Sequence, residues 1–153
     1  MKMKVLRALT AAATLGIAGA AAAGVVAPGD VAFEDGAVAA SLTGKPGDPA
    51  KGREWFKGRK AGNCLACHVN KDLSDESFHG EIGPALDGVA DRYTEAELRG
   101  LVINAKATFE DSIMPSFYRV DHINRPLKKF AGKTILTAEQ VEDVVAYLKT
   151  LEE

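Results

Sequence analysis

The residues with the clearest potential for chemistry are the two cysteines, which both lie in the pentapeptide Cys64-Leu65-Ala66-Cys67-His68. Two thiols three residues apart on a turn can add to the two vinyl groups on one edge of a porphyrin, and the adjacent histidine can then bind the iron through its imidazole. The pattern therefore predicts one covalently attached haem c, with Cys64 and Cys67 as the thioethers and His68 as an axial ligand.

Three other uses of this CxxC pair are considered. A redox-active dithiol usually lies in a strand-then-helix context, and no strand pattern precedes Gly62. A zinc site would need further ligands from His68, His79 and His122, whose spacings match no zinc finger or ribbon. A disulfide across two residues would be strained. Haem attachment is the favoured interpretation for an exported chain with no other cysteine.

A haem iron needs a second axial ligand from a distant part of the chain. Met114 is the only methionine after the N-terminal segment, and it precedes Pro115, which breaks helices and stiffens the loop. A methionine that only fills a core usually lies within helical periodicity, so Met114 is the preferred second ligand. His79 and His122 are the alternatives, and either would give a bis-histidine haem of lower potential.

The composition bounds what the rest of the chain can be. It has 153 residues, 46% hydrophobic and 26% charged, which suits one domain, or one small domain with a tail. The formal net charge of −2 argues against a nucleic-acid-binding protein, which would usually show a basic surface. Two cysteines are too few for a disulfide framework, a four-cysteine zinc site or an all-cysteine iron–sulfur cluster.

The N-terminus has the plan of a secretory signal peptide. Lys2, Lys4 and Arg7 precede an uncharged run over residues 8–27 that is mostly alanine. An uncleaved membrane anchor is the alternative, although alanine and glycine insert less favourably than leucine or phenylalanine. We therefore expect residues 1–27 to be a cleaved signal peptide and the mature protein to be periplasmic. The signal peptide would be the only part of the chain that contacts a membrane.

The boundary of this signal is open, since small residues suited to cleavage lie at both 21–23 and 37–39. Without the three basic residues of the signal, 16 basic residues remain against 21 acidic ones, a formal net charge of −5. Residues 28–48 are rich in Gly, Ala, Pro and Asp, and we expect a flexible lead-in there. The folded domain is expected over residues 49–153.

Capping signals predict short helices in this domain. Asp48 followed by Pro49 predicts a helix start, with the helix running to about residue 60. Two capping boxes, one at Thr94 and one at Thr137, predict two further helices. The apolar faces expected for these two helices are, first, Leu98, Leu101, Val102 and Ala105, and second, Val141, Val144, Val145, Leu148 and Leu151. With no alternating strand, the fold class is all-α, and a buried haem would supply the centre that short helices lack.

Residues 48–153 resemble the class I cytochromes c. Gly52 and Phe56 match the positions at which that family packs its N-terminal helix against the C-terminal one, and Tyr147 and Leu148 match the partners. The segment Gly83-Pro84-Ala85-Leu86-Asp87-Gly88 resembles the family's GPxLxG loop. The resemblance implies that the carbonyl of Pro84 orients the ring N–H of His68.

A narrower resemblance is to the SoxX family, the monohaem subunits of the SoxAX cytochrome complexes of periplasmic sulfur oxidation. It implies a SoxA-like partner, dihaem or monohaem, and Cys64, Cys67, His68 and Met114 as haem attachment and axial residues. It also implies that the complex acts as an L-cysteine S-thiosulfotransferase, which oxidatively couples thiosulfate to a cysteine of a SoxYZ-like carrier. The electrons would pass through this chain to a soluble acceptor. The matching segments are 81–84, 92–93, 113–118, 132–137 and 142–148.

The cysteine count adds a constraint of its own. Transfer of a sulfur group needs a thiol, persulfide or comparable nucleophile, and two thioethers would leave this chain with none. The chain is therefore expected to carry electrons while a partner carries the sulfur chemistry. The alternatives are a free-standing electron shuttle with a small polar docking face, and a peroxidase or sensor with an open iron site. The aromatic segment from Phe117 to Phe130 would either dock a partner or cover the methionine side of the haem.

Overall fold

The computed structural model describes residues 24–121, 123 and 125–153. Its α-helices are α1 (Pro49–Lys57), α2 (Val89–Arg92), α3 (Glu95–Asn104) and α4 (Ala138–Leu148). Four short 3-10 helices lie between them, at Cys64–Ala66, Lys71–Leu73, Ala105–Ala107 and Lys128–Phe130. These described residues contain no strand beyond one isolated bridge between Glu34 and Ala37, which agrees with the expected all-α class. None of the described helices is long and apolar enough to cross a bilayer.

The predicted helix starts are confirmed in atomic detail. The side chain of Asp48 accepts hydrogen bonds from the backbone N–H groups of Ala50 and Lys51, and α1 then ends at Lys57, before the expected residue 60. Thr94 and Thr137 each form a complete capping box, in which the threonine hydroxyl accepts from the third helical N–H and that residue's side chain accepts from the threonine N–H. Local sequence alone therefore sets where α1, α3 and α4 begin.

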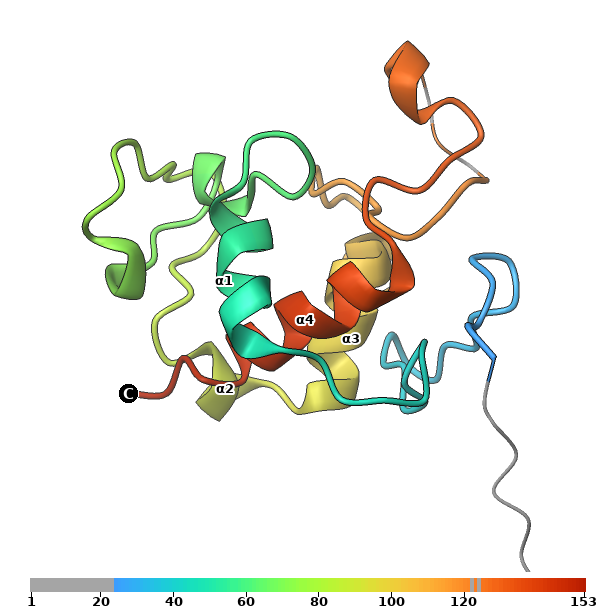
Figure 1. Cartoon of the computed structure of the whole chain (residues 1–153), viewed down its shortest axis with the longest axis horizontal. Coiled ribbons are helices and arrows are strands. Elements are labelled where there is room, and N and C mark those ends of the chain that lie inside the picture. The colour runs from blue at the N-terminus through green and yellow to red at the C-terminus, as the bar shows by residue number, and fades with distance from the viewer. Residues whose placement is uncertain (1–23, 122, 124) are drawn as a thin grey trace, which may run out of the picture.

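The backbones of α1 and α4 approach each other closely where the two helices cross (Figure 1). Gly52 lies so near the backbone of Asp143 that a Cβ atom would collide with its carbonyl group. One turn further, Phe56 meets Tyr147 edge-on with ring centroids 5.5 Å apart. The glycine permits close approach of the two backbones, and the aromatic pair fills the space beside it.

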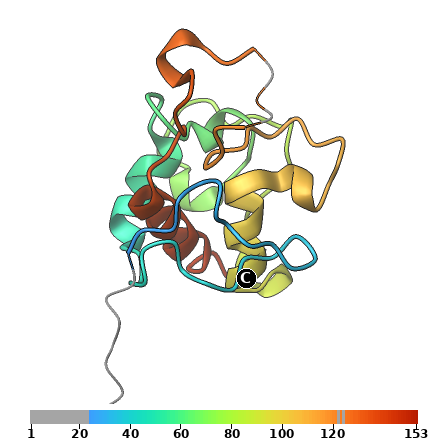
Figure 2. The ribbon, with the colours of Figure 1, turned by 90° about the vertical axis from the view of Figure 1, so that its right-hand side faces the viewer.

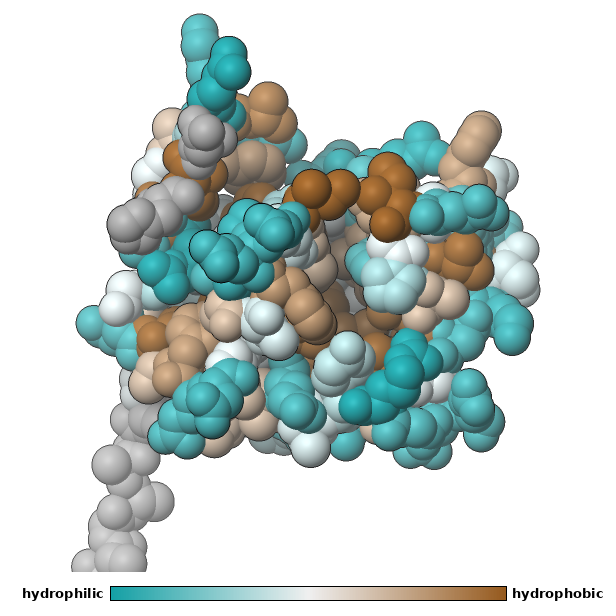
Figure 3. Space-filling view, turned by 180° about the vertical axis from the view of Figure 1, so that it is seen from behind, coloured by the Kyte–Doolittle hydropathy of each residue, from teal (hydrophilic) through white to brown (hydrophobic). Residues whose placement is uncertain are grey.

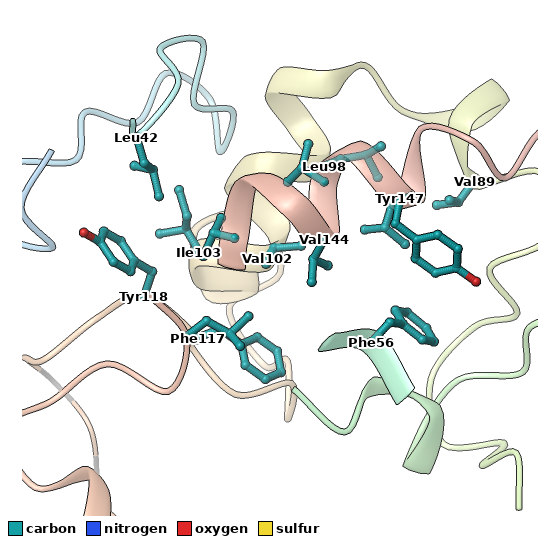
Figure 4. Packing of buried hydrophobic residues seen from close by; sticks show 14 of the residues in the cluster. Leu42, Phe56, Val89, Leu98, Val102, Ile103, Phe117, Tyr118, Val144 and Tyr147 are labelled. Carbon is teal, nitrogen blue, oxygen red and sulfur yellow. The ribbon is translucent and has the colours of Figure 1, made fainter. Parts of the chain in front are cut away.

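The buried faces of α3 and α4 pack against each other in the centre of the molecule (Figure 4). All five residues expected on the apolar face of the last helix are buried, including Leu151 beyond its end. On α3 the prediction needs one correction, because Ile103 is fully buried whereas Leu101 is only half-buried. The buried face of α3 is rotated from the predicted one because Arg99 and Gly100 are also buried, against the segment that precedes α1.

Residues 24–47, here called the N-terminal strap, run across α3 and α4 (Figure 2). Val38 and Leu42 are buried in the same core as the helices. The backbone N–H of Val38 donates to the carbonyl oxygen of Ala96 at the start of α3, at 2.9 Å.

This packing corrects the expectation of a flexible lead-in over residues 28–48. The segment has no helical periodicity, but its polar backbone groups find partners on both helices. Arg99 of α3 donates to the carbonyl oxygen of Val38, and the N–H of Leu42 donates to the carboxylate of Glu142 on α4. Arg99 and Glu142 are themselves a buried ion pair with an N–O distance of 2.9 Å. A packed loop of this kind gives no periodic signal in sequence.

Candidate functional site

The two cysteines lie on a tight turn that follows α1 after residues 58–63. Cys64 opens the first 3-10 helix, and the N–H groups of Cys67 and His68 both donate to the carbonyl oxygen of Cys64 at 3.0 Å. Asn63, the residue before this helix, has a left-handed backbone conformation with φ of 50°. The turn therefore holds both thiols and the His68 ring close together on one short segment, as covalent haem attachment requires.

The other uses of this cysteine pair find no support in the geometry. Both thiols are free, so no disulfide is formed. Burial raises the pKa of the Cys64 thiol to about 12, whereas a redox-active dithiol needs a readily formed thiolate. Within the part of the chain that the structure describes, no group of three His, Cys, Asp or Glu residues could hold a metal ion such as zinc.

His68 is fixed by the loop that follows it in sequence. Its Nδ1 lies 2.8 Å from the carbonyl oxygen of Pro84, which makes the protonated Nδ1 the donor of this bond. The N–H of Gly83 donates to the carbonyl oxygen of Cys67 at 2.8 Å, and the N–H of Leu86 donates to that of Val69 at 2.9 Å. This arrangement leaves Nε2 of His68 without a hydrogen-bond partner among the described residues, and so available to an iron atom.

Two glycines allow the loop to lie this close to the haem-attachment segment. A Cβ atom on Gly83 would overlap the imidazole ring of His68, and one on Gly80 would overlap the carbonyl group of Ala66. Gly80 was not among the residues expected from sequence. A glycine in a loop gives no indication of the backbone it will approach.

His79, one of the two alternative ligands, has both ring nitrogens engaged by backbone groups. Its Nδ1 accepts from the N–H of Asn70 at 3.3 Å, and its Nε2 lies 2.9 Å from the carbonyl oxygen of Leu73. Such a histidine supports the loop and has no nitrogen to offer an iron. The other alternative, His122, lies outside the described residues.

Met114 lies in a loop, as its sequence context predicts, and its half-buried side chain packs against the core. Its backbone is held on both sides. Its N–H donates to the hydroxyl of Ser112 at 3.2 Å, and its carbonyl oxygen accepts from Nζ of Lys106 at 2.7 Å. The thioether therefore lies on a constrained segment far in sequence from His68.

The space-filling view from behind shows a hollow with hydrophobic residues on its walls and rim (Figure 3). A covalently bound haem needs two free thiols on a turn, an imidazole with an available nitrogen, a second ligand such as a thioether, and an apolar hollow. The residues present therefore fit haem c.

The aromatic segment after Met114 begins in the core. Phe117 and Tyr118 are both buried, and Figure 4 shows them among the core residues. Phe130, at the far end of the segment, is half-buried. Val120 and Leu127, between these ends, are 43% and 67% exposed. The buried aromatic pair therefore does not form a docking patch, whereas the rest of the segment leaves apolar side chains at the surface.

Comparisons with known proteins agree with this site. A model of the cytochrome c family matches residues 49–152. A chain from the crystal structure of SoxXA from P. pantotrophus is 51% identical, with a TM-score of 0.78, over 83% of this chain and 98% of that one. The c-type cytochrome SorU from Sinorhizobium meliloti is 27% identical over 68% of this chain and 90% of that one, with a TM-score of 0.45.

A comparison with curated protein sequences found no match. The family model covers most of the chain, and the SoxXA chain is matched over nearly its whole length. The chain therefore belongs to the cytochrome c family, and within it to the SoxX family that its residues resemble.

Proposed function

We propose that this chain is the electron-transfer subunit of a periplasmic SoxXA-type complex, in which it accepts electrons from a SoxA-like haem subunit and passes them to a soluble acceptor. The observation that carries this proposal is the 51% identity to a SoxXA chain over 98% of that chain's length. In the proposed reaction, the complex couples thiosulfate oxidatively to a cysteine of a SoxYZ-like carrier protein. The chain carries one covalently bound haem c, which supplies a one-electron redox centre.

Five residues hold the haem in this proposal. Cys64 and Cys67 would provide the thioethers, His68 and Met114 would be the axial ligands, and the carbonyl group of Pro84 would orient His68. The bond from Nδ1 of His68 to Pro84 fixes the ring and its tautomer, and raises the basicity of Nε2. With two protein ligands on the iron no position is open to a substrate, which argues against a peroxidase or sensor. The protein then only has to hold the redox centre rigidly and shield it from water.

The sulfur chemistry is assigned to the partner because this chain has no other cysteine. Once both thiols are thioethers, no nucleophilic sulfur remains on the chain to accept thiosulfate. The SoxA-like subunit or the carrier must then supply it. The chain contributes by removing electrons from the oxidative coupling.

Exposed hydrophobic side chains support a fixed partner over a transient electron shuttle. Ile82, in the loop that fixes His68, is 68% exposed, and Ile113, directly before Met114, is 79% exposed. One of them therefore lies on the loop that orients the proposed ligand His68, and the other lies beside the proposed ligand Met114. A transient docking face would be small and polar, whereas a permanent interface has an apolar centre.

Partner capture tests the proposed function. The mature chain, tagged and co-produced with a SoxA-like haem protein, is expected to retain that protein through purification. Ile113→Ser should weaken retention at least several-fold because it removes apolar contact area. Val25→Ser is the matched control, since Val25 is also exposed but lies in the N-terminal strap. Recovery of the chain as a monomer under conditions that load its haem would instead indicate a free shuttle.

Absorption spectroscopy tests the ligands directly. The ferric protein should show the weak long-wavelength band of an iron–thioether bond, and Met114→Ala should remove it. Extraction of the denatured protein with acidic solvent should leave the colour on the polypeptide. Colour in the solvent would contradict attachment through Cys64 and Cys67, and a band that survives Met114→Ala would contradict the assignment of that ligand.

A further inference from the structure

The N-terminal strap is anchored at one end to the helical core. The carbonyl oxygen of Val38 accepts from Nη1 of Arg99 at 2.9 Å, and the N–H of Leu42 donates to Oε1 of Glu142 at 2.8 Å. The side chains of Arg99 and Glu142 are each only 4% exposed, so water competes little for these bonds. This end of the strap is therefore fixed to α3 and α4.

The other end of the strap reaches the segment that follows Met114. The N–H of Val26 donates to the carbonyl oxygen of Leu42 at 2.8 Å, which ties this end to the anchored one. The carbonyl oxygen of Val26 then accepts from the hydroxyl of Tyr118 at 2.7 Å. Residues 26 and 118 are far apart in sequence, so this bond joins the strap to the methionine loop.

Tyr118 lies where the methionine loop joins the core. Its N–H donates to the carbonyl oxygen of Ile103 on α3 at 3.3 Å. The carbonyl oxygen of the preceding Phe117 accepts from the N–H groups of Ile135 and Leu136, both at 3.0 Å. The loop end is thus bonded to α3, to residues 135–136 and, through the Tyr118 hydroxyl, to the strap.

The polar bonds of the methionine loop differ in their exposure to water, and the bond from Tyr118 to Val26 is itself partly buried. The bond from Lys106 to the carbonyl oxygen of Met114 is exposed, and the bond from the Ser116 hydroxyl to Asn104 is partly buried. The Tyr118 side chain is buried, and burial raises the pKa of its hydroxyl group, which keeps the hydroxyl protonated as a donor. Its bond to Val26 is therefore the bond that ties this loop to the N-terminal strap.

We propose that Tyr118 is a positioning residue, which holds Met114 on the haem iron by tying the methionine loop to the N-terminal strap. The proposal rests on the proposed role of Met114 as an axial ligand. A loop ligand leaves its metal when the loop opens locally, and local opening is governed by the contacts that hold the loop. Loss of the Tyr118 hydroxyl would leave the carbonyl group of Val26 without its partner and favour the open loop.

Cyanide binding to the haem-loaded ferric protein measures this opening, because cyanide can take the iron only after the methionine has left. Tyr118→Phe keeps the buried ring and removes only the hydroxyl. We expect the variant to retain the long-wavelength iron–thioether band, but to bind cyanide about threefold to tenfold faster than the wild type. Amide hydrogen exchange over residues 112–118 should accelerate in parallel.

Tyr147→Phe is the matched control. It removes a tyrosine hydroxyl that donates to Asp72 and accepts from Asn70, two residues that follow His68 in sequence and are far from Met114 in the chain. Its cyanide rate should equal that of the wild type. Equal rates for Tyr118→Phe and the wild type, or equal acceleration in both variants, would overturn the proposal. If the wild type lacks the iron–thioether band, the ligand assignment fails and the role of Tyr118 falls with it, whereas a band with equal rates refutes only the role of Tyr118.

Discussion

Nδ1 of the His68 imidazole lies 2.8 Å from the carbonyl oxygen of Pro84. The two partners are sixteen positions apart in sequence. The bond exists because the glycine before Pro84 brings no side chain against the ring. Gly83 and Pro84 thus act together, one by leaving space and the other by accepting the proton of Nδ1.

This relationship predicts a large effect from a single methyl group. Gly83→Ala would place a Cβ atom within the His68 ring, so either the ring or the loop must move. Overpacking of this kind costs about 1–3 kcal/mol of unfolding free energy, and we expect less haem-loaded protein as well. Urea denaturation and the ratio of haem to polypeptide measure both. Gly29→Ala is the control because a Cβ there meets nothing within 4 Å; an equal effect of both variants would contradict this account.

The buried pair Arg99–Glu142 predicts that the N-terminal strap contributes to stability. Arg99→Met would leave Glu142 charged, buried and without its main partner, at a cost of about 3–5 kcal/mol in unfolding free energy. Urea denaturation followed by circular dichroism would detect it. Arg119→Met removes a more exposed ion pair and should cost less than about 1 kcal/mol. Similar costs for the two variants would show that the buried pair does not hold the strap.

Sequence was sufficient for the features of this fold that are local. The caps of α1, α3 and α4 each involve residues within three positions of one another, and the haem-attachment motif spans five. The apolar face of α4 follows from periodicity alone. Helix starts, motif chemistry and the all-α class could therefore be predicted from the order of the residues.

What sequence did not provide are the contacts between distant segments. A buried arginine on α3 looks like a surface residue until Glu142, 43 positions away, is placed beside it. Leu42 looks like part of a flexible tail until its N–H meets the same carboxylate, 100 positions away. The contact of Pro84 with His68 was expected only because the loop resembles that of a known family, whereas the bond between Tyr118 and Val26 had no such precedent.

The carboxyl group of Asp72 should make part of the unfolding free energy depend on pH. The pKa of its carboxyl group is lowered, chiefly by the hydrogen bond from the Tyr147 hydroxyl and then by Arg53. A carboxylate with a lowered pKa in the folded state stabilises the protein above the unfolded pKa of about 3.9, and this contribution disappears as pH falls through the lower folded value. Acidification below about pH 4 should therefore cost stability.

Unfolding free energies measured from pH 5 to pH 2 would test this dependence. Asp72→Asn should lose a component of no more than about 1 kcal/mol, because the carboxylate is 46% exposed and its ion pair is screened by water. Tyr147→Phe should reduce the same component, since it removes the principal cause of the lowered pKa. If Asp72→Asn unfolds with the wild-type pH dependence, acid sensitivity originates elsewhere.

The packing of the N-terminal strap also bears on the two candidate cleavage sites. Processing at residues 37–39 would remove Val26 and the buried Val38, and would leave the hydroxyl of Tyr118 without its acceptor. Processing at residues 21–23, which lie outside the described part, leaves every described contact of the strap intact. We therefore predict that the exported mature protein begins before Val26.

Intact-mass measurement of the haem-loaded protein from the periplasm would locate this N-terminus. A chain that begins at Ala40 serves as the comparison, and we expect its unfolding free energy to be at least about 2 kcal/mol lower, because a buried valine alone contributes about that much. It should also bind cyanide faster in the ferric state, for the same reason as Tyr118→Phe. A native mass that corresponds to cleavage at residues 37–39 would show that the strap is absent from the working protein, and that Met114 is held without it.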